Sequence, residues 1–225
     1  MRPIDAARGR RPLAPQQPDI LLRDLALGHG ADLADRADLD SRQFADLPDA
    51  PLNLRDASVL NCRFTDVRSQ DVDLRGASVR ETEVIRPDFT VTQAWRGRWS
   101  DVRVEAGRLG VLEAYDSAWN AVELVGCKLS FVNLRGSEVS DLTLRECQIE
   151  ELDVSEGSIR RASLSGSHVK RLNFRGARME NVDLRGADYD EIAGVMSMRG
   201  TLLTESQLAE LAPLMAEALG ISVLS

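Results

Sequence analysis

The sequence between residues 52 and 191 repeats every five residues, and this period constrains the fold more than any other feature of the chain. Every fifth residue from Leu54 to Tyr189 is apolar, with Ser69 as the one exception. The residue two positions before each of these is never charged. Because residues two apart in a strand point to the same face, both series are predicted to point inward. The segment is therefore predicted to be a long β-structure around a filled interior.

A period of five cannot belong to a straight strand, because an odd repeat would send every second apolar pair into water. The chain must turn once in each repeat, and the recurrent glycine at the last position of the repeat fits such a corner. A twenty-residue echo counts the turns, since QAWRGRW at 93–99 matches EAYDSAW at 113–119. Four repeats then complete one coil. The sequence predicts an all-β solenoid, a quadrilateral β-helix of about 7 coils over 52–191.

The sharpest repeats resemble the pentapeptide-repeat family, whose consensus is A(D/N)LXX. They are VDLRG (72–76), VNLRG (132–136), LNFRG (172–176) and VDLRG (182–186). The resemblance implies the pentapeptide-repeat fold and a right-handed coil. Within this family the chain is distantly similar to the MfpA/Qnr-type DNA mimics. That similarity implies binding to DNA gyrase or another type II topoisomerase, as an inhibitor or as a protector against fluoroquinolones.

The segments outside the repeats have different compositions. Residues 1–18 contain four prolines and four arginines, which predicts a flexible tail. Residues 19–51 include ADLDS and RQFAD in the five-residue register (37–46), which predicts an N-terminal cap with degenerate repeats. Caps of this kind protect the open edges of a solenoid.

Residues 192–225 are predicted to be a helical cap at the other end. Thr204 and Gln207 have the spacing of a capping box, and Gly220 is placed to end the helix. Pro213 predicts a kink or two short helices. The apolar face is also a candidate homodimer interface, consisting of Leu208, Leu211, Met215 and Leu219.

Composition indicates a protein of the cytoplasm that neither crosses a membrane nor binds nucleic acid directly. The net charge is −8, and no apolar run is long enough for a membrane span or a secretory signal. The chain has three cysteines without CxxC spacing and two histidines, so neither a metal site nor a disulfide framework is expected. The cysteines are predicted to be buried hydrophobic residues.

Catalytic activity is not expected of this chain. A general acid and base need a cleft that displaces their pKa values, and a filled convex rod provides none. No nucleotide-binding, zinc-protease or serine-hydrolase motif occurs. We therefore predict a protein that is not an enzyme, has no cofactor and acts by presenting a surface to a protein partner.

One candidate partner surface is apolar. Val91, Val111 and Phe131 recur at steps of twenty and are predicted to form an outward column, with Trp95 and Tyr115 on the next side. Two interpretations remain open. Residues 19–51 could fold back over this column, or the column could be a scaffold surface that binds an unknown partner through its aromatic residues.

The second candidate surface is acidic, and it suits the DNA-mimic hypothesis. It consists of Glu146, Glu150, Glu151, Asp153, Glu156, Asp183, Asp188, Asp190 and Glu191. Duplex DNA carries about one charge per 1.7 Å, so a rod of about 34 Å would need about 20 net negative charges to match it. The repeat segment has 24 acidic and 20 basic residues, and no side is a continuous acidic stripe. This balance weakens the DNA-mimic hypothesis.

Overall fold

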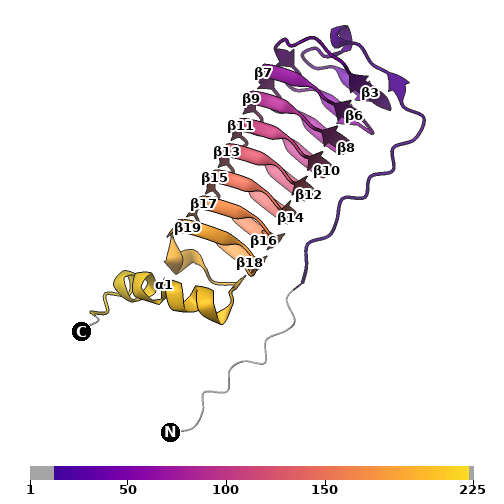
Figure 1. Cartoon of the computed structure of the whole chain (residues 1–225). Helices are drawn as coiled ribbons and strands as arrows, with labels where there is room; N and C mark the ends of the chain where they lie inside the picture. The colour runs from indigo at the N-terminus through magenta and orange to yellow at the C-terminus, as the bar shows by residue number, and fades with distance from the viewer. Residues whose placement is uncertain (1–12, 223–225) are drawn as a thin grey trace.

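Parallel strands stack into an elongated rod of about 9 turns (Figure 1). This computed structural model describes residues 13–222. From residue 38 to residue 193, each strand pairs with the strand of the next turn at an offset of twenty residues, so Trp99 lies between Val79 and Trp119. The echo in the sequence is therefore the length of one turn, and the predicted β-solenoid is confirmed.

Two parallel sheets run along the rod. The 12-stranded sheet contains β1 (Ala26–Leu27), β2 (Asp38–Asp40), β3 (Arg42–Ala45), β5 (Ser58–Leu60), β6 (Arg63–Thr65), β8 (Ser78–Ile85), β10 (Arg98–Glu105), β12 (Ala118–Val125), β14 (Glu138–Arg145), β16 (Ser158–Ser163), β18 (Arg178–Asp183) and β20 (Thr201–Leu202). The 8-stranded sheet contains β4 (Leu52–Asn53), β7 (Arg68–Asp73), β9 (Asp88–Gln93), β11 (Arg108–Glu113), β13 (Lys128–Asn133), β15 (Gln148–Asp153), β17 (His168–Asn173) and β19 (Asp188–Ala193). Two short 3-10 helices, η1 (Gly30–Asp32) and η2 (Val195–Ser197), lie near the ends.

The four corners of a turn differ in backbone conformation. At three of the four corners, residues adopt a left-handed φ. One of these corners is formed in successive turns by residues that include Glu81, Asp101 and Asp141, with φ of 47°, 55° and 58°. The predicted corner glycines also adopt a left-handed φ, for example Gly76 with φ of 68°. At the fourth corner Val91 keeps an ordinary φ, which suits a β-branched side chain. Apolar residues can therefore occupy this one corner of the coil without strain.

The inward residues form one continuous core, as the period predicts. Trp99 and Trp119 stack inside the coil with ring centroids 5.0 Å apart, and Phe44 stacks on Phe64 at 4.8 Å. The three cysteines, Cys62, Cys127 and Cys147, are free and buried. A hydrogen bond with Cys127, together with burial, raises the pKa of the Cys147 thiol. A thiol with a raised pKa is a poor nucleophile, in keeping with the predicted hydrophobic role.

The rod begins earlier than expected, and this corrects the predicted coil number. Strands β2 and β3 pair with β5 and β6 at the same twenty-residue offset. Strand β1 adds part of a further turn by pairing with β3. The solenoid therefore has about 9 turns instead of 7, since the degenerate repeats of the N-terminal cap form genuine coils.

The C-terminal end is closed by helix α1 (Glu205–Ala218). The predicted capping box is present, since Gln207 N–H donates to Thr204 Oγ1 at 3.1 Å and Thr204 N–H donates to Gln207 Oε1 at 2.9 Å. Gln207 Nε2 also donates to the main-chain oxygens of Leu184 and Ala187 in the last coil. The prediction of two short helices is wrong, because α1 continues through Pro213. Gly220, with φ of 71°, follows the end of the helix.

The described part of the N-terminal segment returns along the rod instead of leaving it. From β1, residues 13–25 lie along the 12-stranded sheet toward the C-terminal end (Figure 1). Composition predicts a flexible tail over 1–18, whereas residues 13–18 are held against the solenoid by hydrogen bonds to side chains. Residues 1–12 of that predicted tail lie outside the described part of the chain.

Candidate functional site

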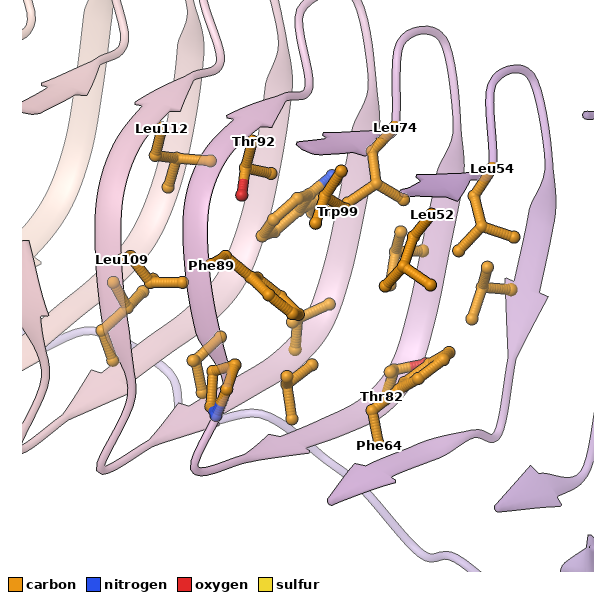
Figure 2. A pocket seen from close by; sticks show the side chains of 18 residues that line it. Leu52, Leu54, Phe64, Leu74, Thr82, Phe89, Thr92, Trp99, Leu109 and Leu112 are labelled. Carbon is orange, nitrogen blue, oxygen red and sulfur yellow. The ribbon is translucent and has the colours of Figure 1, made fainter. Parts of the chain in front are cut away.

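An internal cavity of about 70 Å³ lies within the N-terminal coils (Figure 2). Its walls are Leu, Val, Phe and Trp side chains, joined by Pro87, Thr82 and Thr92. Thr82 Oγ1 donates to the Arg80 main-chain oxygen, while Thr92 Oγ1 is buried with no partner among residues 13–222. The lining contains no ionisable side chain, so this space supplies neither a general acid nor a nucleophile.

The predicted apolar column is a ladder of the 8-stranded sheet. Val91 pairs with Val111, and Val111 pairs with Phe131, so the three side chains lie in register at the corner with ordinary φ. Each is half-buried. Adjacent strands lie about 4.8 Å apart, so neighbouring side chains cover much of one another.

The aromatic pair on the adjoining side also stacks. The rings of Trp95 and Tyr115 have centroids 5.3 Å apart and an interplanar angle of 11°. The Arg75 guanidinium lies over the Trp95 ring at 5.2 Å, a cation–π contact that sequence reasoning missed. The step of twenty from Trp95 back to Arg75 was the available signal. We call Val91, Trp95, Val111, Tyr115 and Phe131 together the aromatic corner.

Residues 19–51 do not fold back over the aromatic corner. Residues 26–51 form the first coils of the rod, whereas residues 19–25 lie along the 12-stranded sheet, where Asp19 N–H donates to Asp101 Oδ1 in β10. Within residues 13–222, this segment therefore does not cover the apolar column.

The ladder of the aromatic corner continues directly into the acidic surface. Phe131 pairs with Glu151, Glu151 with Arg171, and Arg171 with Glu191. The structure thus joins two features that the sequence placed separately. Glu150, Glu151, Asp153, Asp188, Asp190 and Glu191 lie on β15 and β19, whereas Asp183 lies on β18 of the other sheet.

Basic residues neutralise much of the acidic surface. Strand β17 lies between β15 and β19, and its Lys170 and Arg171 pair with Glu150 at 3.2 Å and Glu151 at 2.8 Å. Two more acids have basic partners, since Glu156 pairs with Arg135 and Asp183 with Arg185, and Asp190 lies 3.8 Å from the His168 imidazole. The hydrogen bond from Arg185 holds the pKa of Asp183 below its ordinary value. Within residues 13–222, Glu146, Asp153, Asp188 and Glu191 form no ion pair.

The candidate dimer helix divides its apolar residues between two environments. Leu211 is buried against the last coil, and Met215 is half-buried. Leu208 and Leu219 are 51% and 60% exposed. Helix α1 thus packs on the last coil through a narrower apolar face than the sequence predicts. Two of the four candidate dimer residues, Leu208 and Leu219, stay on the surface.

Two charged residues are buried although they occupy outward positions of the repeat. Glu123 and Asp141 are 2% and 1% exposed, although neither belongs to the two inward series of the repeat. Glu123 pairs with Arg103 at 2.8 Å and with Arg145 at 3.3 Å. Both nitrogens of the Arg161 fork donate to the Asp141 carboxylate. Something outside the coil must therefore cover this face.

The fold defines the class of protein, a four-sided parallel β-solenoid, and comparison with known proteins then identifies its repeat. The family described as pentapeptide repeats matches residues 158–188, which confirms the resemblance seen in the sequence. The chain is therefore a parallel β-solenoid that carries pentapeptide repeats over residues 158–188. Within residues 13–222, no helix has the length and apolar character of a membrane span.

Three solved structures illustrate the likeness. Trypsin-treated QnrB1, a plasmid-mediated fluoroquinolone resistance protein, is 16% identical over 84% of this chain and 99% of its own, with a TM-score of 0.30. Full-length QnrB1 is 16% identical over 88% and 99%, with a TM-score of 0.26. HetL, a pentapeptide repeat protein of the cyanobacterium Nostoc involved in heterocyst differentiation regulation, is 15% identical over 75% and 90%, with a TM-score of 0.18. No curated protein sequence matches the chain. Likeness at this level bears on neither partner nor activity.

Proposed function

We propose that this chain is a non-catalytic scaffold that binds a protein partner through the aromatic corner. The observation that supports this proposal is the ladder itself. Two aromatic rings stack 5.3 Å apart in the turns after β9 and β11, on the side that adjoins the corner where three apolar residues lie in register. An apolar ladder of this kind on the outside of a repeat protein is typical of a contact surface.

The aromatic corner has the composition of a binding centre with a polar rim. Trp and Tyr are enriched among the residues that contribute most to binding, because they bury large areas at a low cost in side-chain entropy. Their positions are fixed before a partner arrives, by the stack and by the strand ladder, so little further ordering is needed. Arg75, Asp71 and Glu151 border the corner and can supply hydrogen bonds at its edge.

Site-specific photo-crosslinking in an extract of the host cell tests the scaffold proposal. A photoreactive residue in place of Ser130, beside Phe131 on β13, is expected to give covalent protein adducts. The matched probe in place of Ser165, which is exposed in the turn after β16 at another corner, is expected to give none of these adducts. Adding Trp95→Ala and Tyr115→Ala to the Ser130 probe should abolish them. Equal adducts at both positions, or none at Ser130, would contradict the proposal.

A second candidate is DNA mimicry toward DNA gyrase or another type II topoisomerase. The family resemblance points to it, and the end of the 8-stranded sheet supports it with the acids Asp188, Asp190 and Glu191 on the last strand, β19. The ion pairs of β17 count against it, because they interrupt the acidic surface between β15 and β19. On this candidate the protein would act as a competitive occupant of the DNA site, with relevance to quinolone resistance.

A supercoiling assay with purified gyrase separates the two candidates. DNA mimicry predicts inhibition, or protection from a fluoroquinolone, at micromolar protein, and a steep loss of the effect between low and high salt. The variant Asp183→Asn, Asp188→Asn, Asp190→Asn, Glu191→Gln should lose the effect. The control Glu138→Gln, Glu180→Gln, which changes two acids outside the acidic surface, should keep it. An effect lost only on Trp95→Ala would assign gyrase to the aromatic corner, and no effect would exclude gyrase as the partner.

A further inference from the structure

The N-terminal segment contacts the solenoid with a regular stride. Leu13 N–H donates to Asn181 Oδ1 at 3.3 Å, Gln16 N–H to Asp141 Oδ1 at 2.9 Å, and Asp19 N–H to Asp101 Oδ1 at 3.0 Å. The donors are three residues apart. The acceptors are forty residues apart, which is two turns of the rod. The segment therefore advances two coils for every three of its own residues.

This stride matches the repeat of an extended proline-rich chain. Two coils span about 9.6 Å, at about 4.8 Å between strands. Three residues of a polyproline II helix span about 9.3 Å and complete one turn, so every third residue faces the same way. Pro15 and Pro18 lie directly before the donors Gln16 and Asp19. Each proline lacks an N–H and restricts the residue before it to extended conformations, so the donors fall at the positions between the prolines.

The face beneath the segment is built to receive it. The outward positions at and between these acceptors are Ala121, Glu123, Asp141 and Thr143, and all four are buried. Ala121 lies between the acceptors Asp101 and Asp141, and its small side chain leaves room for a second backbone. Arg161 fixes the Asp141 carboxylate, so the acceptor is already oriented toward Gln16.

Main-chain N–H groups of the segment donate all three of these hydrogen bonds, to side-chain oxygens of the solenoid. Among its side chains, Leu13 and Leu21 are 61% and 64% exposed, whereas Pro15, Pro18, Ile20 and Leu22 are half-buried. Recognition through main-chain groups depends on where prolines and N–H groups fall, and it tolerates changes of side chain. A ligand held in this way can be exchanged for another with the same spacing.

We infer that this face of the 12-stranded sheet is a binding site for an extended peptide with a proline at every third residue, and that residues 13–22 occupy it in cis. The partner is a proline-rich segment of another protein, which docks when the chain's own segment lifts away. This site lies on a different sheet from the aromatic corner, so it does not depend on the function proposed above.

A cut-and-exchange experiment on the full chain tests this inference. A protease site is placed between Arg23 and Asp24, both exposed, and the folded protein is cut there. A fluorescent peptide LAPQQPDILL, the sequence of residues 13–22, is then added in excess, and binding is followed by anisotropy. The cut protein is expected to bind the peptide at least tenfold more tightly than the uncut protein, in which the tethered segment competes.

The matched control is the peptide LAQPQPDILL, in which the first proline and the following glutamine exchange places. It has the same composition but no N–H opposite Asp141, so it is expected to bind at least tenfold more weakly. Asp101→Ala in the cut protein should weaken the binding of the native peptide several-fold. The inference is overturned if both peptides bind equally, if the folded cut protein binds neither, or if the severed segment stays bound and never exchanges.

Discussion

Replacing Trp119 by alanine is expected to lower the free energy of unfolding by about 3–5 kcal/mol. Trp119 is 2% exposed and stacks on Trp99 inside the coil, so its removal leaves a cavity bounded by strands on every side. The strands cannot collapse into this cavity without breaking the twenty-residue register on both sides. Chemical denaturation followed by circular dichroism measures the loss.

Trp95→Ala is the matched control for that change. Trp95 also stacks on an aromatic ring twenty residues away, but it points outward and is half-buried. Its replacement should cost about 1 kcal/mol, mainly the stacking contact. Trp119→Phe should recover most of the lost stability, since the Trp119 Nε1 is buried with no partner within residues 13–222 and phenylalanine has no N–H to satisfy. A loss from Trp95→Ala as large as that from Trp119→Ala would contradict the assignment of inner and outer ladders.

Replacing Asp141 by alanine is expected to destabilise the chain by about 3 kcal/mol. Asp141 is 1% exposed, and its partner Arg161 is 18% exposed in its side chain, so the change leaves a largely buried guanidinium without a carboxylate. It also removes the acceptor of Gln16 N–H, so the N-terminal segment loses its central contact. Denaturation gives the size of the effect, and amide hydrogen exchange of residues 13–22 shows whether the segment is released.

The pair of Asp66 and Arg86 is the control for this prediction. It has the same geometry at the same spacing of twenty residues, with two hydrogen bonds from the arginine fork, but both side chains are 54% exposed. Asp66→Ala should change the free energy of unfolding by less than about 1 kcal/mol, because solvent screens an exposed pair. Equal losses at Asp66 and Asp141 would show that the N-terminal segment does not bury its site.

Low pH is expected to release the contact between the N-terminal segment and Asp141. Burial alone would raise the pKa of Asp141, but the hydrogen bonds from Arg161 and Gln16 together hold that pKa below its ordinary value. A folded pKa below the unfolded one contributes stability above about pH 4, and this contribution is lost as the pH falls through the folded value. Asp141→Asn should therefore remove part of the acid sensitivity of hydrogen exchange in residues 13–22.

The fold could be read from the sequence because of how a solenoid makes contacts. Each residue packs against the residues twenty before and twenty after it, so a linear period encodes the three-dimensional neighbours. For the same reason the stack of Trp95 on Tyr115 and the column of Val91, Val111 and Phe131 were predictable. The number of turns was underestimated because the first coils keep the geometry of the repeat after losing its consensus.

The candidate sites were only partly predictable, because their properties depend on pairings across the period. Which acids are neutralised depends on the residue in the adjacent coil, as with Glu151 beside Arg171. The same register shows that the apolar and acidic surfaces form one ladder, which follows from the alignment of Phe131 with Glu151. Both could have been obtained by writing the sequence in rows of twenty.

By itself, the sequence determined the solenoid, its four sides, its core and the helix that closes it, because these depend on contacts at fixed separations. Only the tertiary structure decided the place of residues 13–22. Gln16 and Asp141 are 125 residues apart, a separation that belongs to no period of the chain. Composition predicts a flexible tail over residues 1–18, since prolines and polar residues cannot form a core of their own. They are ordered here because two coils and three extended residues have nearly the same length.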